Sequence, residues 1–111
     1  MMLCIRKPDL FIADFDARFC WYDQQADWEL ACQYLDAVDT TWVKPAKLPD
    51  LGMLTRFEEP ERHGLRFLPV VRPFHRHLIF FRSDAEDLDA WRLMHGARDL
   101  PRRLLEPSGT D

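Results

Sequence analysis

The sequence predicts an α+β fold in which two helices come first and a mainly antiparallel sheet follows. The first half of the chain repeats apolar residues at steps of three and four, the spacing of amphipathic helices. The second half has short apolar runs separated by Pro, Gly and polar turns, as antiparallel strands do. Helices grouped before strands are typical of α+β proteins.

Two helices are expected between residues 8 and 44. The apolar positions that define them are Phe11, Phe15, Phe19 and Tyr22, followed by Trp28, Ala31, Leu35, Val38 and Trp42. Pro8 suits the first turn of the first helix, and Asp27 is the expected N-cap of the second. Because residues 24–26 give only a short connection, the two helices are expected to form an antiparallel hairpin.

The second helix is expected to end near Lys44. Pro45, Pro49 and Gly52 oppose its continuation, so residues 44–52 are interpreted as a turn within the domain.

Strands are expected at residues 53–57, 65–72, 77–82 and 87–95, with a short one at 3–6 before the helices. Pro69 argues for an edge or a bulge, whereas the compact apolar run 77–82 suits a central strand. Asp99 followed by Pro101 resembles the start of a short C-terminal helix.

Length and composition indicate one domain covering residues 1–111. No apolar run approaches the roughly 18 residues that a bilayer span needs, and residues 1–7 are too poor in apolar side chains for a secretory signal. A cytoplasmic protein without membrane contact is therefore expected. The number of cysteines is odd, and no two of them form a CxxC pair. This predicts unpaired, mostly buried thiols at Cys4, Cys20 and Cys32.

Charge is distributed unevenly along the chain. The formal net charge is −4, and residues 1–50 carry all of it, with five Lys and Arg against nine Asp and Glu. From Arg62 to Arg82 there are five Arg, three His and no acid. Arg offers a rigid fork for carboxylate or phosphate, so this window suggests a surface for an acidic partner or nucleic acid. A solvated strand face explains it equally well.

Familiar catalytic motifs are absent from the sequence. The four glycines are isolated, so there is no glycine-rich phosphate loop, and no Ser or Thr lies in a nucleophile elbow. His75 and His77 would share a face if both lay on a strand, and His63 or His95 could join them around a metal. Surface or hydrogen-bonded histidines are the better interpretation, so neither a metal nor a cofactor is expected.

Several segments resemble the ParE/RelE toxin superfamily. They are the strand segment Gly64-Leu-Arg-Phe-Leu-Pro-Val, the run Pro73-Phe-His-Arg-His-Leu-Ile-Phe-Phe-Arg82 and the segment Trp91-Arg-Leu-Met-His-Gly-Ala-Arg-Asp99. The last of these carries the specific His-Gly-Ala-Arg-Asp signature that is typical of ParE. The predicted helices and Pro49-Asp-Leu-Gly52 extend the resemblance to nearly the whole chain.

The resemblance implies a helical hairpin on a curved, mainly antiparallel sheet with a short C-terminal helix. It also implies the toxin of a bacterial type II toxin–antitoxin system of the kind linked to plasmid stabilisation. The implied partner is a cognate antitoxin, a small DNA-binding protein whose tail folds on the toxin and forms a hetero-oligomer.

Two mechanisms occur in the superfamily, and the resemblance to ParE favours inhibition of DNA gyrase by binding, without enzyme activity. The residues expected to contact gyrase or antitoxin are Arg66, Arg72, Arg76, Arg82, Arg92 and Arg98. The alternative is a RelE-like, ribosome-dependent mRNA endoribonuclease, for which the catalytic candidates are Arg66, Arg82, His95 and Arg98. A degenerate, non-toxic binding protein of the same fold is a third hypothesis. Structural roles compete throughout: Gly96, for example, could end a strand in a left-handed conformation.

Overall fold

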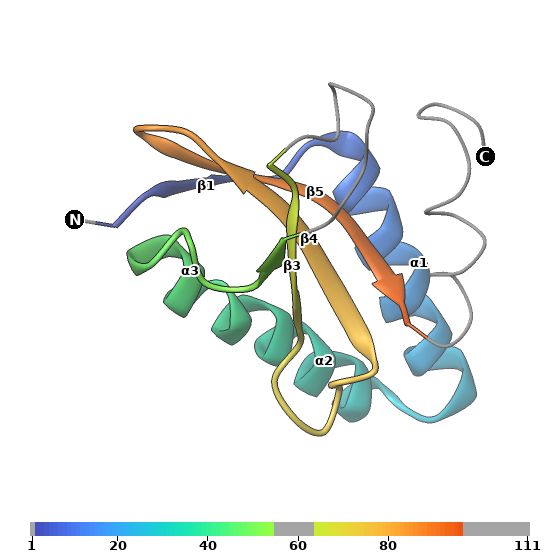
Figure 1. Cartoon of the computed structure of the whole chain (residues 1–111). Helices are drawn as coiled ribbons and strands as arrows, with labels where there is room; N and C mark the ends of the chain where they lie inside the picture. Colours follow the sequence, from blue (N-terminus) through green and yellow to red (C-terminus); the bar gives the residue numbers. More distant parts are fainter. Residues whose placement is uncertain (1, 55–63, 97–111) are drawn as a thin grey trace.

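The computed structural model describes residues 2–54 and 64–96. The helix expected after Asp99, the candidate Arg98, and residues 55–63 lie outside the described residues. The elements follow in the order β1 (Cys4–Arg6), α1 (Asp9–Gln25), α2 (Trp28–Thr41), α3 (Val43–Lys47), β2 (Met53–Leu54), β3 (Arg66–Pro69), β4 (His77–Ser83) and β5 (Asp87–His95) (Figure 1).

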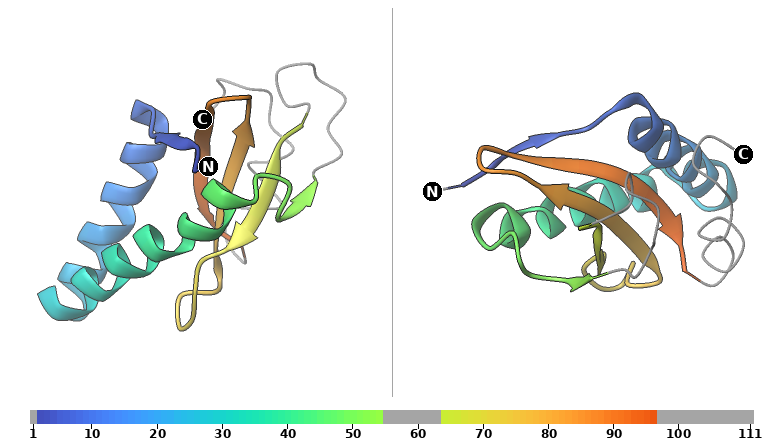
Figure 2. Two further views of the ribbon diagram at one scale, coloured as in Figure 1. Left: turned by 90° about the vertical axis from the view of Figure 1, so that its left-hand side faces the viewer. Right: turned by 45° about the horizontal axis from the view of Figure 1, so that its top comes forward.

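The strands form one five-stranded sheet in the order β1-β5-β4-β3-β2. β1 runs parallel to β5, and the other neighbours are antiparallel. Helices α1 and α2 lie together on one side of this sheet (Figure 2). The prediction of an α+β fold with a mainly antiparallel sheet is therefore confirmed.

β4 is the central strand, as its apolar run predicted. Ile79 and Phe81 point toward the helices and are completely buried in the main core. Phe80, between them, belongs to a second apolar cluster with Leu65 and Met94 on the opposite face of the sheet. A bulge between Phe80 and Phe81 shifts the register with β5, so that Phe81 lies opposite Ala90 and Phe80 opposite Arg92.

Local signals explain where α2 begins. The Asp27 side chain accepts a hydrogen bond of 2.8 Å from the backbone N–H of Leu30, so the predicted N-cap is confirmed. α1 and α2 are joined by two residues, Ala26 and Asp27, and pack against each other.

The second helix ends three residues before Lys44, but the interpretation of residues 44–52 as a turn is wrong at its start. α2 ends at Thr41, and a separate short helix, α3, continues to Lys47 with Pro45 inside it. Pro45 is the third residue of α3, where a backbone N–H has no intrahelical acceptor, so the missing donor costs nothing.

The turn that follows depends on Gly52. Its φ is +103°, and a Cβ there would lie 2.9 Å from the carbonyl oxygen of Phe67. β2 pairs only with Arg66 and Phe67, so among the described residues β3 has no neighbour beside Pro69 on that side. The missing N–H of Pro69 therefore leaves no ladder bond unmade, in line with its predicted edge position.

The prediction of mostly buried thiols is wrong. Cys4 and Cys20 are exposed and Cys32 is half-buried, although none is in a disulfide. Among the described residues, none of the helices is long and apolar enough to cross a membrane.

Candidate functional site

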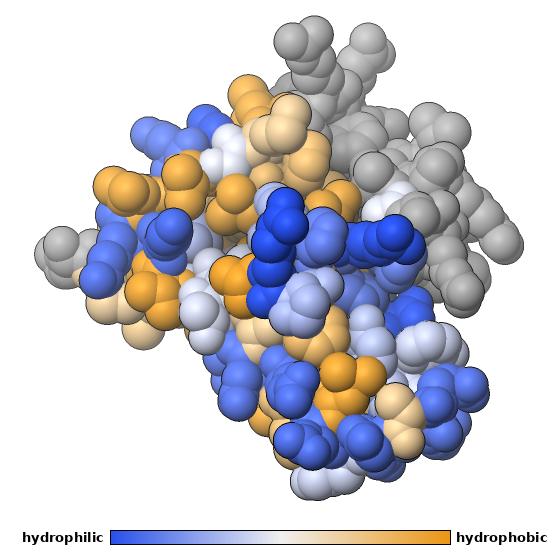
Figure 3. Space-filling view, turned by 90° about the horizontal axis from the view of Figure 1, so that it is seen from below, coloured by the Kyte–Doolittle hydropathy of each residue, from blue (hydrophilic) through white to orange (hydrophobic). Residues whose placement is uncertain are grey.

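Three segments that are distant in sequence meet at the lower end of the molecule in Figure 1: the C-terminal half of α1, the turn between β3 and β4, and the end of β5. They enclose a pocket of about 250 Å³, which we call the basic pocket. Its lining residues are Arg18, Trp21, Tyr22, Pro73, Phe74, Arg76, His77 and His95. Seen from below, this end of the molecule shows strongly hydrophilic groups among separate apolar ones (Figure 3).

Polar aromatic side chains form the inner wall of the basic pocket. The Tyr22 hydroxyl lies 2.7 Å from Nε2 of His77, and the ring of His77 lies edge-on to that of His95 at 5.0 Å between centroids. His77 is only 3% exposed. Partial burial raises the pKa of the Tyr22 hydroxyl, since the anion is poorly solvated there, and the charge of Arg18 opposes this shift. Tyr22 is therefore held as a neutral hydroxyl at neutral pH.

Two arginines give the basic pocket its charge. The Arg18 guanidinium lies over the ring of Trp21, with 5.2 Å between Cζ and the ring centroid, and Arg76 is exposed in the β3–β4 turn. Of the described residues, those that line the pocket include no acid. The pocket thus combines two guanidinium groups with exposed aromatic surface, a combination suited to binding anions.

Gly96 lies at the edge of this site, where its backbone comes close to that of Arg76; it does not adopt the expected left-handed conformation. Its φ is not positive, so that expectation is wrong. Its N–H donates a 2.7 Å hydrogen bond to the carbonyl oxygen of Arg76, and a Cβ at Gly96 would lie 3.2 Å from the same oxygen. This contact joins the end of β5 to the β3–β4 turn that carries Arg76.

Arg92, predicted to contact a partner, is buried and paired inside the molecule. Its Nε and Nη2 donate hydrogen bonds of 2.7 and 2.9 Å to the two carboxylate oxygens of Asp14 on α1. Asp14 also accepts a 3.1 Å bond from the backbone N–H of Leu93. The guanidinium fork of Arg92 is occupied by this ion pair, so it is not part of an exposed basic surface.

Arg66 and Arg82 lie far from His95. Arg82 is opposite Asp89 in the β4–β5 ladder, whereas His95 is opposite His77, five residues earlier in β4. At the usual rise per residue this separation is about 17 Å. The ribonuclease candidates Arg82 and His95 are therefore not brought together.

Arg66 sits against the turn before β2. Its Nη1 donates a 3.2 Å hydrogen bond to the carbonyl oxygen of Gly52, and its Nη2 is 4.0 Å from a carboxylate oxygen of Asp50. Of the predicted contact residues, Arg72 and Arg76 are exposed together in the β3–β4 turn.

Among the described residues, His75, His77 and His95 do not assemble into a metal site. His75 is exposed in the turn before β4, whereas His77 is buried in β4 and bonded to Tyr22, so the two do not share a strand face. Within residues 2–54 and 64–96, no group of three or more His, Cys, Asp or Glu side chains could hold a metal ion.

The opposite end of the β4–β5 ladder is acidic. Arg6 of β1 lies within 4.0 Å of three carboxylates, those of Asp84, Asp87 and Asp89. The pKa of Asp84 is lowered, chiefly by hydrogen bonds from the backbone N–H groups of Asp87 and Glu86 and less by Arg6. The sheet is thus basic at one end and acidic at the other.

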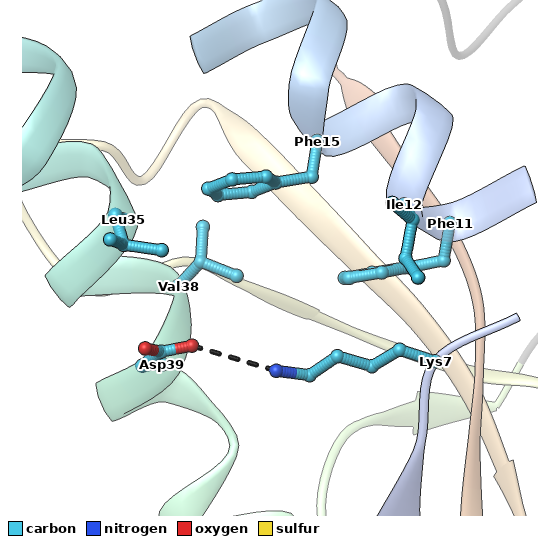
Figure 4. Close-up of a pocket in the computed structure, with 7 residues that line it drawn as sticks. All are labelled: Lys7, Phe11, Ile12, Phe15, Leu35, Val38 and Asp39. Carbon is cyan, nitrogen blue, oxygen red and sulfur yellow. Dashed lines mark ion pairs between the residues drawn. The ribbon is translucent and has the colours of Figure 1, made fainter. Parts of the chain in front are cut away.

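A second, apolar groove lies between α1 and α2 (Figure 4). It has a volume of about 70 Å³ and is lined by Lys7, Phe11, Ile12, Phe15, Leu35, Val38 and Asp39. Lys7 and Asp39 form an ion pair of 3.6 Å across one end. Ile12 and Leu35 are exposed at 43% and 37%, so apolar surface is available along this groove.

Sequence reasoning missed the contribution of α1 to the basic pocket. Arg18, Trp21 and Tyr22 are spaced three and four apart, so they share one side of a helix, and this spacing was the available signal. Only folding places that side against the β3–β4 turn.

The fold is shared with a chain of known structure. That chain comes from the "Chromosomal ParDE TA system from P. aeruginosa"; the TM-score is 0.65 and the identity 22%, and the match covers 85% of this chain and 96% of the other. No family model matches the sequence, and no curated protein matches it.

Proposed function

We propose that this protein is the toxin of a type II toxin–antitoxin system. The observation that carries the proposal is the fold shared with a chain of a chromosomal ParDE system over 85% of this sequence. The ParE-like signature from His95 to Asp99 supports the same assignment independently, because it is a local sequence pattern and not a property of the fold.

The target proposed for the toxin is DNA gyrase, which it inhibits by binding. The ParE-like signature favours this target. The separation of Arg82 from His95 argues in the same direction, because a phosphoryl-transfer centre needs its cations and its proton donor around one phosphate. Among the described residues of the predicted contact set, Arg72 and Arg76 are the exposed cations best placed to meet an acidic partner.

The proposed partner is an antitoxin with a tail that folds on binding. The groove between α1 and α2 suits an apolar segment of such a tail, since five of its seven lining residues are apolar. Acidic residues of the tail would complement Arg72 and Arg76. This partner would hold the toxin in an inactive hetero-oligomer in the cytoplasm.

The proposal is tested by expressing the chain alone, under tight control, in a bacterium that carries a DNA-damage reporter. We expect growth arrest with the reporter switched on, because poisoned gyrase leaves breaks in the chromosome. Arrest with a silent reporter and cleaved mRNA would replace gyrase inhibition by the RelE-like alternative. Normal growth, with folded protein present in the cells, would indicate the degenerate, non-toxic form.

A further inference from the structure

The basic pocket has features of a ligand site that go beyond the contact with an acidic partner proposed for Arg76. It is bounded by two arginines and by the rings of Trp21, Tyr22 and Phe74, and its described lining contains no carboxylate to balance the charge. The chain as a whole carries a net charge of −4, so this local excess of positive charge is not a general property of the surface.

The size and lining of the pocket restrict the class of ligand. Pockets for drug-sized ligands measure about 300–1,000 Å³. At about 250 Å³ the basic pocket is just below this range, so it has room for one small ligand and not for an extended chain. A lone carboxylate would satisfy the arginines but would leave the aromatic walls without a contact, whereas an anion that carries a planar ring would use both.

We propose that the basic pocket binds one nucleotide, with its phosphate at Arg76 and Arg18 and its base against Trp21. Arg forms paired hydrogen bonds to phosphate oxygens, and bases stack on Trp rings and on guanidinium planes. Trp21 is 40% exposed, and Cζ of Arg18 lies over its ring, 5.2 Å from the ring centroid.

The inner wall of the pocket is polar and held in place by contacts of its own. The Tyr22 hydroxyl and the His77 ring are held 2.7 Å apart, and His95 closes the wall beside His77. The hydrogen bond from Gly96 to the carbonyl oxygen of Arg76 fixes the turn that carries the phosphate-binding side chain. The site is thus built on a helix and two strand ends, which limits the ordering cost of binding.

The test is an NMR titration of the full, isotope-labelled chain with AMP. We expect AMP to shift the backbone amide signals of Trp21, Arg76 and Gly96, with a dissociation constant of about 0.1–1 mM. Adenosine and inorganic phosphate, used separately, are each expected to bind at least about tenfold more weakly, because each engages only half of the site.

Two variants locate the phosphate. Arg76→Ala should weaken AMP binding about tenfold, since it removes a charge-assisted contact. Arg72→Ala is the matched control, because Arg72 is exposed in the same turn but does not line the pocket; it should change the affinity by less than about twofold. Trp21→Ala, checked for folding by circular dichroism, should lower the affinity about five- to tenfold.

The source of the nucleotide is distinguished by a single-stranded adenine octanucleotide. If the octanucleotide binds with the same affinity per site as AMP, the natural ligand is a free nucleotide. If it binds more tightly, the natural ligand is a nucleotide within a single strand. The inference would be overturned if AMP shifted none of these amide signals up to about 10 mM, or if Arg76→Ala and Arg72→Ala had equal effects. Displacement of AMP by hexaglutamate at equal affinity would also overturn it. Because no gyrase is present, this outcome is independent of the proposed toxin function.

Discussion

Asp14 and Arg92 form a two-pronged ion pair that joins the middle of α1 to β5, with N–O distances of 2.7 and 2.9 Å. Their side chains are 13% and 9% exposed. The Leu93 N–H, on the edge of β5 beyond its pairing with β1, donates to the same carboxylate. One acidic side chain thus neutralises a buried guanidinium and satisfies a strand edge that could otherwise pair with another chain.

Asp14→Ala is expected to lower the free energy of unfolding by about 3 kcal/mol, because it leaves the Arg92 guanidinium buried without its carboxylate. Urea unfolding followed by circular dichroism measures the change. Asp16→Ala is the control on the same helix, since Asp16 is exposed, and it should change stability by less than about 0.5 kcal/mol. Equal effects of the two substitutions would contradict the role given to the ion pair.

Asp27→Ala is expected to destabilise the protein by about 1 kcal/mol, because the N–H of Leu30 loses its acceptor at the start of α2. Asp27→Asn keeps an oxygen in the same place and should retain most of the stability. If Asn were as damaging as Ala in thermal unfolding, the hydrogen bond would not be the cause.

Gly52→Ala and Gly64→Ala separate backbone strain from crowding. Both residues have positive φ, +103° and +75°, so alanine is strained at either position. A Cβ at Gly52 would also meet the Phe67 carbonyl oxygen at 2.9 Å, whereas at Gly64 the nearest atom is 3.8 Å away. We expect a loss of about 1 kcal/mol at Gly64 and a larger loss at Gly52. Unfolding midpoints in the reverse order would contradict this geometry.

Asp84 is expected to contribute to the acid sensitivity of the protein. Its pKa is lowered from 3.8 in the folded state, chiefly by the backbone N–H groups of Asp87 and Glu86. A group whose folded pKa is depressed stabilises the fold above its unfolded pKa, and this contribution is lost as the pH falls through the folded value. Asp84→Asn should therefore flatten the stability–pH curve below about pH 4 and leave its slope near pH 7 unchanged. If Asp84→Asn left the stability–pH curve unchanged in this acid range, the Asp84 carboxylate would not contribute to the acid sensitivity.

The periodicity of the chain predicted most of the fold because that information is local. The apolar steps of α1 and α2, the cap at Asp27 and the run of β4 depend on residues close in sequence. Pro45 was misread because proline breaks a helix interior but not a first turn. Cys20 was misjudged because residue type predicts burial less well than position does, and its place on α1 faces solvent.

The candidate site could be predicted only in part. The arginine-rich window contains Arg76 and His77, which line the basic pocket, and the β3–β4 turn. The burial of Arg92 depends on an acid 78 residues away, and the pocket depends on α1 meeting the end of β5. Pairings over such distances in sequence arise from tertiary packing, which no local pattern contains.

The most direct test of the central claim is a supercoiling assay with purified DNA gyrase, relaxed plasmid and the purified chain. Inhibition of gyrase by binding predicts that supercoiling falls as the chain is added and that cleaved plasmid accumulates in a gyrase-dependent way. Unchanged supercoiling at a large molar excess of folded protein, together with cleavage of mRNA on ribosomes by the same preparation, would contradict it.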